Sequence, residues 1–262
     1  RYQEQASLST KFLERLRVVL VETSHPGNIG ATARAMKVMG LQHLVLVNPR
    51  FFPHPEATAL ASGAEDILER AQVTADLAAA LQGCHKVYGT SARDRRIQWP
   101  VLDAREAAVE MVAELADGNC ALVFGRERTG LSNEELDHCQ VLVNIPTAEL
   151  YHSLNLGQAV QVLAYELHMA TLQANLEPHP DPDVTSVELA APMEDMEGFY
   201  DHLEQVLRQS GFLQEIRAIR MMRRLRRLYD RARPTVNEVN ILRGILTEIQ
   251  RWATNSRQKG SG

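Results

Sequence analysis

Five short apolar runs, separated by segments with polar turns and helical spacing, dominate the first half of the chain. Most of the runs are continuously apolar and do not alternate, which is typical of strands buried on both faces of a parallel sheet. Strands that alternate with helices predict an α/β fold in which helices cover the sheet. The runs lie at residues 16–22, 44–48, 86–91, 120–125 and 140–146.

The pattern changes at residues 175–195, which are rich in proline and acidic residues and show no sustained period. We interpret this segment as a linker. Beyond it only helical spacing remains, which predicts a small all-helical domain at residues 196–254. A chain of 262 residues is long enough to bury one sizeable core and a smaller second one. We therefore expect an N-terminal extension at residues 1–14 and an α/β domain at residues 15–174, before the linker and the helical domain.

The composition excludes several classes of protein. The chain has no run of about 18 apolar residues, and its N-terminus is polar where a signal peptide needs an apolar segment, so a cytoplasmic protein is expected. The three cysteines form no CxxC pair, so neither a disulfide framework nor a metal site is expected. The net charge of −5 argues against a protein that coats nucleic acid indiscriminately, although a total hides local clusters.

The segment ETSHPGNIGATARAMKVMG links the first two runs through a glycine-containing turn and a predicted helix. A dinucleotide-binding loop needs the spacing G-x-G-x-x-G and an acidic residue at the end of the second strand. This segment has the spacing G-x-x-G, and the second run ends in Asn48, so both requirements fail. Asn28 is predicted to cap the helix. One face of this helix is predicted to carry Gly30, Arg34 and Lys37. This face could bind an anion, or it could equally be a basic surface that is only solvated.

The segment FGRERTGLSNEEL follows the fourth apolar run. Gly130 suits a turn with positive φ, and Ser132 with Glu135 predicts a capping box that starts a short helix. Glycines close to the carboxyl end of a parallel strand are typical of ligand sites, but turn chemistry explains Gly125 equally well. Glu127 is predicted to be a surface residue.

The segment IPTAELYHSLNL follows the fifth run, which ends at Ile145. Ser153 is predicted to cap the long helix that begins there, and Asn155 in its first turn points polar groups toward the neighbouring loops. A simple cap with an exposed amide explains the same residues.

Taken in order, NIGATAR, FGRERTGLSNEEL and IPTAELYHSLNL resemble motifs one, two and three of the SpoU branch of the SPOUT RNA methyltransferases. With GTSARDRRIQWP and the helical tail, the chain is similar to the bacterial tRNA 2′-O-methyltransferases of that branch, which modify anticodon-loop nucleotide 32. The resemblance runs from Leu16 to the C-terminal helices. It implies S-adenosylmethionine (S-adenosyl-L-methionine) as cofactor, tRNA as substrate, and a homodimer with the cofactor site near its interface. It also implies a trefoil knot in the parallel-sheet domain, which physical reasoning alone does not predict because threaded connections are nearly absent from proteins.

The same resemblance implies roles for individual residues. Arg34 occupies the motif-one position that handles the proton of the ribose 2′-hydroxyl. Because the pKa of arginine exceeds about 12, we favour donation to the oxygen as negative charge develops, with a deprotonated arginine as the alternative. The implied catalytic set is Arg34, Asn28, Ser153 and Asn155. The implied cofactor-binding set is Thr90, Ser91, Ala92, Gly125, Ile145, Ser153 and Leu154.

RNA binding needs positive surface that the total charge conceals. Residues 211–233 contain eight arginines and two acidic residues, a net charge of +6. Apolar residues at helical spacing predict one packed face that leaves the arginines to contact phosphates, with a solvated face as the alternative. A second basic cluster lies beside Trp99. The candidate RNA-binding residues are Arg34, Lys37, Arg93, Arg95, Arg96, Arg223, Arg224, Arg226 and Arg227.

Two other functions stay open at this stage. A metabolite-binding or oxidoreductase domain is disfavoured by the failed dinucleotide fingerprint. A non-catalytic RNA-binding protein on the same scaffold is the nearer alternative, since a fold does not guarantee an activity. Arg34 and the complete third motif argue against it. The sequence does not distinguish a preference for cytidine from one for uridine.

Overall fold

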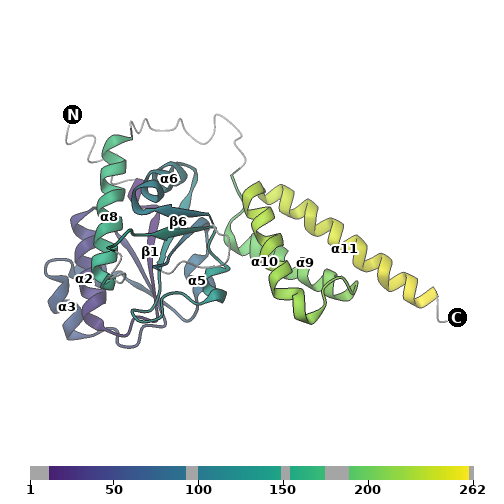
Figure 1. Cartoon of the computed structure of the whole chain (residues 1–262), viewed down its shortest axis with the longest axis horizontal. Coiled ribbons are helices and arrows are strands. Elements are labelled where there is room, and N and C mark those ends of the chain that lie inside the picture. Colours follow the sequence, from purple (N-terminus) through teal and green to yellow (C-terminus); the bar gives the residue numbers. More distant parts are fainter. Residues whose placement is uncertain (1–11, 93–99, 149–153, 175–188, 260–262) are drawn as a thin grey trace. The chain divides into compact units, whose positions relative to one another are not determined.

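The computed structural model of the chain describes residues 12–92, 100–148, 154–174 and 189–259 (Figure 1). The chain divides into two compact units, Arg1–Ser186 and Val187–Gly262. Arg93, Arg95, Arg96 and Ser153, which the resemblance places in the RNA-binding, catalytic and cofactor-binding sets, lie outside the described residues.

The first unit contains a seven-stranded sheet with the order β3-β2-β1-β6-β4-β7-β5 and parallel pairing throughout. The predicted parallel-sheet α/β fold is confirmed. The sequence missed both edge strands because each has only three residues, too few to show a pattern. The strands are β1 (Leu16–Val21), β2 (His43–Val47), β3 (Gln72–Thr74), β4 (Cys84–Thr90), β5 (Val101–Asp103), β6 (Asn119–Phe124) and β7 (Val141–Asn144).

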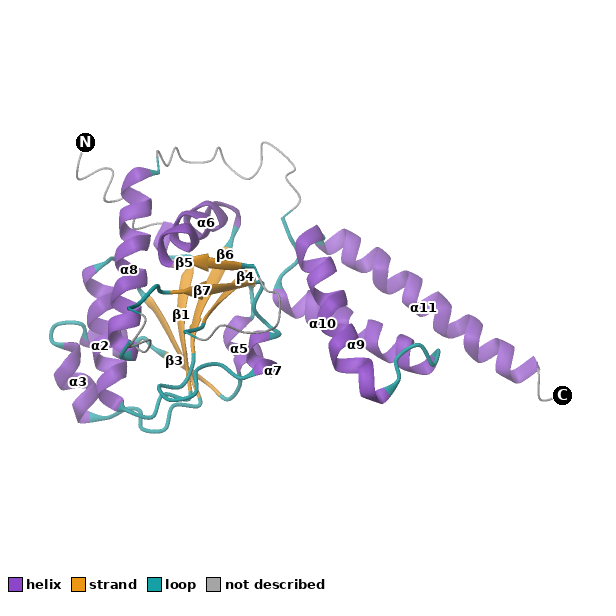
Figure 2. Cartoon of the chain, viewed as in Figure 1, coloured by secondary structure: helices purple, strands orange, loops and turns teal. Residues whose placement is uncertain are grey.

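Helices cover the sheet on both faces (Figure 2). One face packs against α2 (Pro26–Val38), α3 (Pro55–Ala61), α4 (Glu65–Glu69), α6 (Ala104–Asp117) and α8 (Leu156–Gln173), and the main core forms there. Alternate strand residues such as Val18, Leu20 and Phe124 point into this core and are almost fully buried. The opposite face carries the short helices α5 (Leu77–Leu81) and α7 (Asn133–Leu136). Burial on both faces explains why the central strands are continuously apolar.

Parallel pairing brings the carboxyl ends of the strands to one edge of the sheet. The loops after β1, β6, β4 and β7 are neighbours there, because these strands are adjacent in the sheet order. Hydrogen bonds to β7 fix the loop after β4: Ser91 N donates to Val143 O at 3.0 Å, and Asn144 Nδ2 donates to Ser91 O at 3.0 Å. Thr90 Oγ1 donates to Val123 O at 3.1 Å. The segments that the three motifs supply therefore converge on this edge.

The second unit consists of α9 (Met193–Gln209), α10 (Glu215–Ala232) and α11 (Val236–Lys259) around its own small core. Phe199 and Tyr200 are almost fully buried, and the ring of Phe199 meets that of Tyr229 edge-on at 4.8 Å. Ala190 forms a bridge with Thr235. The helical unit thus starts before residue 196, the boundary expected from the sequence. Ala190 already pairs with Thr235, and α9 already begins at Met193.

No helix in the described ranges combines the length and the apolar character that crossing a membrane requires.

Candidate active site

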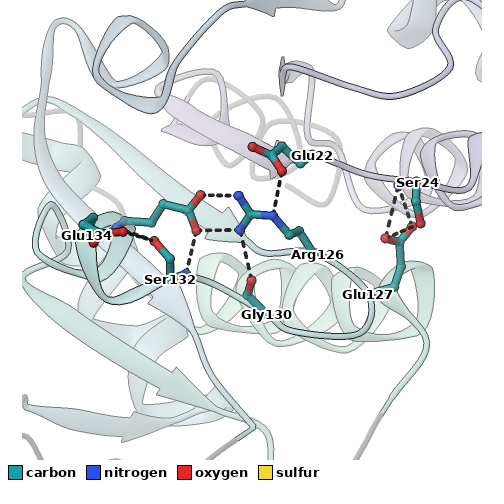
Figure 3. Close-up of polar contacts among 8 residues, drawn as sticks. Glu22, Ser24, Arg126, Glu127, Gly130, Ser132 and Glu134 are labelled. Carbon is teal, nitrogen blue, oxygen red and sulfur yellow. Dashed lines mark hydrogen bonds and ion pairs between the residues drawn. The ribbon is translucent and has the colours of Figure 1, made fainter.

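Glu127 in the loop after β6 accepts hydrogen bonds from the loop after β1, and Figure 3 shows the contact with Ser24. Ser24 donates through its backbone N at 3.2 Å and through Oγ at 3.0 Å. His25 N donates at 3.1 Å and Asn28 Nδ2 at 3.0 Å. The prediction that Glu127 is a surface residue is wrong, because its half-buried carboxylate links motif two to motif one.

Burial opposes the ionisation of Glu127, but the hydrogen bonds from Asn28, Ser24 and His25 outweigh it. They hold the pKa of the carboxyl below its ordinary value. The site therefore contains a fixed negative charge whose acceptor positions are filled by backbone and amide donors.

Asn155 extends this connection to motif three. Its Nδ2 donates to Asn28 Oδ1 at 2.9 Å, while its Oδ1 accepts from Gly157 N at 2.9 Å and so caps α8. The cap of α8 is thus Asn155, and not Ser153 as predicted. Asn28 does not cap α2, because His25 is the N-cap residue and Pro26 opens the helix. Asn28 instead lies in the first turn, 9% exposed, with its amide bonded to Glu127 on one side and Asn155 on the other.

Arg126 forms a second link between motif two and the loop after β1 (Figure 3). Its Nε donates to Glu22 at 2.7 Å, and its two terminal nitrogens donate to Glu135 at 3.0 and 2.9 Å. The hydrogen bond from Arg126 lowers the pKa of Glu22. Glu135 also accepts from Ser132 N at 2.7 Å, which confirms the predicted capping box. Gly130 has φ +68°, so the predicted positive-φ turn is confirmed as well.

Gly125 is required by the loop itself. A Cβ atom at this position would overlap the backbone of Gly130 and Leu131. The backbone that closely approaches Gly125 is therefore that of residues 130 and 131, at the other end of the motif-two loop. Gly30 is similar, because a Cβ there would overlap the carbonyl of Ala57 in α3.

We expect Gly125→Ala to destabilise the first unit, because the added methyl meets backbone that no side-chain rotation can clear. Thermal unfolding without cofactor should show a lower Tm, with a loss of about 1–3 kcal/mol. Gly244→Ala, in α11 of the second unit, is the control, since no atom lies within 4 Å of a Cβ there. An unchanged Tm with weaker cofactor binding would show that Gly125 contacts the cofactor directly.

Arg34 lies on α2, exposed, and makes no hydrogen bond or ion pair with any residue in the described ranges. Lys37 on the same helix is bound to Asp66, with 2.6 Å between Nζ and Oδ1. Two cations were predicted on this face. Among the described residues Lys37 has an acidic partner and Arg34 has none, so the guanidinium of Arg34 is available to a ligand.

The cofactor-binding candidates lie on three loops at one edge of the sheet. Thr90 ends β4 and Ser91 follows it, Gly125 follows β6, and Ile145 and Leu154 lie between β7 and α8. Ala92 and Leu154 are exposed, and the Leu154 residue is 38% accessible. These uncharged residues offer apolar surface and backbone polar groups, which together suit an adenosine.

The arginines of α10 divide into inner and outer groups. Arg226 donates to both oxygens of Glu197 at 2.6 and 2.7 Å, and its guanidinium lies 4.5 Å from the centroid of the Tyr200 ring. This side chain therefore helps to hold the helical unit together, which argues against the predicted RNA contact at Arg226. Arg223 and Arg227 are half-buried. The exposed arginines of the segment are Arg217, Arg220, Arg224, Arg231 and Arg233.

Comparison with known proteins gives consistent matches along the chain. Residues 15–165 match the SpoU rRNA methylase family, and residues 194–259 match the C-terminal domain of the tRNA methyltransferase TrmJ. The TrmJ protein of Pseudomonas aeruginosa is 52% identical over 95% of this chain and 99% of its own length. That of Klebsiella pneumoniae is 51% identical over 91% and 97%.

Two solved structures extend the likeness to the fold. The crystal structure of TrmJ from Z. mobilis ZM4 has a TM-score of 0.77 at 33% identity, and the match covers 89% of this chain and 98% of that one. A probable methylase from Haemophilus influenzae has a TM-score of 0.60 at 42% identity, over 93% and 99%. The chain therefore belongs to the SpoU methylase family, with a second unit of the TrmJ C-terminal type.

Proposed function

We propose that this protein is an S-adenosylmethionine-dependent enzyme that methylates the ribose 2′-hydroxyl of tRNA at anticodon-loop nucleotide 32, with cytidine or uridine as substrate. The names of its relatives support the substrate class, since that from Photorhabdus laumondii is a tRNA (cytidine/uridine-2′-O-)-methyltransferase. The name of the Pseudomonas aeruginosa relative includes adenosine as well. One structural observation carries the proposal: hydrogen bonds run from Glu127 through Asn28 to Asn155, while Arg34, on the same helix as Asn28, is exposed and forms no hydrogen bond or ion pair with the described residues.

The cofactor is proposed to bind among Thr90, Ser91, Gly125, Ile145 and Leu154. When bound, S-adenosylmethionine supplies an electrophilic methyl group. The hydroxyl of Thr90 and the backbone N of Ser91 are already bonded within the protein, so recognition rests on shape, on apolar contact and on the remaining backbone groups. Gly125 contributes by shaping the loop and not by leaving room for the adenine.

Arg34 is proposed to act on the ribose oxygen. The 2′-hydroxyl is a poor nucleophile at neutral pH, and negative charge develops on its oxygen as its proton passes to solvent and the oxygen attacks the methyl group. A guanidinium that donates to this oxygen stabilises the charge and also orients the adjacent phosphate. Asn28 and Asn155 are proposed as positioning residues, because both of their amide groups are engaged in the network that fixes the start of α2. Ser153 is proposed to hold the ribose or the Arg34 side chain.

A homodimer is proposed as well, with the cofactor site near its interface. Helices α2 and α8 pack together and expose apolar side chains: Val38 is 64% exposed, Tyr165 47% and Leu172 42%. Burying such side chains against a second copy is favourable by about 25 cal/mol per Å² of apolar area. This proposal follows from the family and from these exposed residues.

Incubation with labelled S-adenosylmethionine and unmodified tRNA, followed by mapping of the methylated nucleotide, tests the activity. We expect a 2′-O-methyl group at nucleotide 32. Binding of tRNA without any transfer would favour the alternative, a non-catalytic RNA-binding protein. Methylation elsewhere in the tRNA would keep the reaction and reject the position.

The exposed arginines of α10 are proposed to contact tRNA phosphates, and removal of the second unit tests this. A chain ending at Ser186, where the first unit ends, should fold, form a dimer in sedimentation, and bind cofactor. It should bind tRNA more weakly and with a shallower salt dependence, because each lost phosphate contact lowers the slope of log affinity against log salt by about 0.7–0.9.

The full chain measured over the same salt series is the control for this truncation. Equal slopes and affinities in the two forms would show that the arginine surface is merely solvated. Loss of cofactor binding or of the dimer would show that the second unit belongs to the catalytic core.

A further inference from the structure

The loop between β2 and α3 exposes an aromatic ring beside a cation. Phe51 is 47% exposed, and the Cζ atom of Arg50 lies 5.2 Å from the centroid of its ring. The ring of His54 lies near it as well, with 6.4 Å between centroids and 54° between planes. The phenyl ring thus has two side chains beside it while almost half of the residue remains open to solvent.

Arg50 is an exposed guanidinium whose contact with Phe51 is its sole side-chain interaction among the described residues. Two other exposed cations of the unit, Lys37 and Arg70, are neutralised by Asp66. A cation over an aromatic face gains about 0.5–1 kcal/mol at an exposed site and keeps its N–H donors outward. The positive charge of Arg50 is therefore available to an anionic partner.

Phe51 is more exposed than its neighbour Phe52. Phe52 packs against the main core and anchors the loop, whereas Phe51 points away from it. An aromatic residue that adds nothing to the core and remains exposed beside a free cation is a candidate for binding.

The position of this loop relates it to the candidate active site. Arg50 N donates to Thr23 O at 3.1 Å, and Glu22 N donates to Val47 O at 2.8 Å. Thr23 directly precedes Ser24, which Glu127 binds. The loop that carries Phe51 is thus hydrogen-bonded to the loop after β1, which Glu127 of motif two also binds.

Unpaired nucleotides offer the two groups that this arrangement suits. A nucleobase stacks on an aromatic ring irrespective of its identity, and the adjoining phosphate pairs with arginine. A purely apolar partner would leave the Arg50 charge unmatched. We propose that Phe51 and Arg50 bind one unpaired nucleotide of the RNA substrate, with its base stacked on the exposed part of the Phe51 ring and its phosphate paired with Arg50. This inference rests on the proposed function for the identity of the RNA.

Phe51 variants separate stacking from simple apolar contact. We expect Phe51→Ala and Phe51→Leu to raise the Kd for unmodified tRNA by about 10-fold, within the range of a lost base–aromatic stack, and Phe51→Trp to bind like the parent. Arg50→Ala should weaken binding and lower the salt slope by about 0.7–0.9. Val73→Ala, at an exposed residue of the edge strand β3, is the matched control. The full chain is used throughout, and unchanged Tm values verify that each variant folds.

Abasic nucleotides placed singly in the anticodon loop identify the stacked base. One abasic position should weaken binding by the parent protein and have no further effect on Phe51→Ala. Parent-like binding by Phe51→Ala, or by Phe51→Leu alone, would overturn the stacking proposal. Methyl transfer by the parent protein is measured separately, so a failure of the proposed function is distinguishable from a failure of this inference.

Discussion

Arg34→Ala is expected to lower kcat for methyl transfer by about 100-fold or more, while folding, dimerisation and cofactor affinity stay unchanged. Loss of a group that stabilises developing charge or handles a proton has effects of this size. The fold should not suffer, because the side chain is exposed and makes no hydrogen bond or ion pair with the described residues. Single-turnover rates with saturating tRNA measure the chemical step apart from binding.

Arg34→Lys should fail almost as completely. An ammonium keeps the charge but lacks the planar fork that can donate to two oxygens in a fixed geometry. A near-normal rate for Arg34→Lys would show that charge alone suffices, and a parent-like rate for Arg34→Ala would remove this residue from the mechanism. Arg70→Ala is the matched control, because Arg70 is an exposed arginine of the same unit that is paired with Asp66.

Glu127→Ala is expected to reduce turnover by about 100-fold, although Glu127 is not proposed to touch the substrate. Its carboxylate accepts from Ser24, His25 and Asn28, so its removal leaves these donors without their acceptor and frees the start of α2, from which Arg34 projects. Positioning losses of this kind have large effects on rate. Glu127→Gln should also be impaired, because an amide presents a donor where the protein already presents donors. A structural role alone would lower the Tm without changing kcat in the folded protein.

Glu134→Gln is the matched control for Glu127→Gln. Glu134 is an exposed glutamate of the same segment whose carboxylate accepts from Ser132 Oγ at a long 3.4 Å. Parent-like kcat in both variants would contradict the positioning role of Glu127.

The pH dependence of stability gives an independent measure of the Glu127 contacts. Because the folded-state pKa of Glu127 lies below its ordinary value of 4.5, its ionised form stabilises the fold above that pH. This contribution is lost as the pH falls from about 4.5 through the folded-state pKa. The free energy of unfolding should therefore fall less steeply with acid in Glu127→Gln than in the parent protein.

The sequence by itself determined those features that neighbouring residues decide. The five central strands were predictable because burial on both faces makes each of them a continuous apolar run. The capping box of Ser132 and Glu135 was predictable because its two members are three residues apart and bond each other's backbone. The order of the three motifs was sufficient to identify the family, which the comparisons then confirmed.

The tertiary structure alone decided which polar side chains meet. Glu127 reaches Asn28 across 99 residues of sequence, and Asn155 reaches Asn28 across 127, so no local pattern reports either contact. Arg226 and Arg224 are alike in sequence, yet one is bound to Glu197 and the other is exposed, because the packing of α9 selects the face of α10 that is buried. Phe51 and Phe52 divide in the same way between solvent and core. The physical reason is common to all three cases: local sequence sets the conformation of a segment, whereas the partner of a side chain depends on segments that only the folded chain brings together.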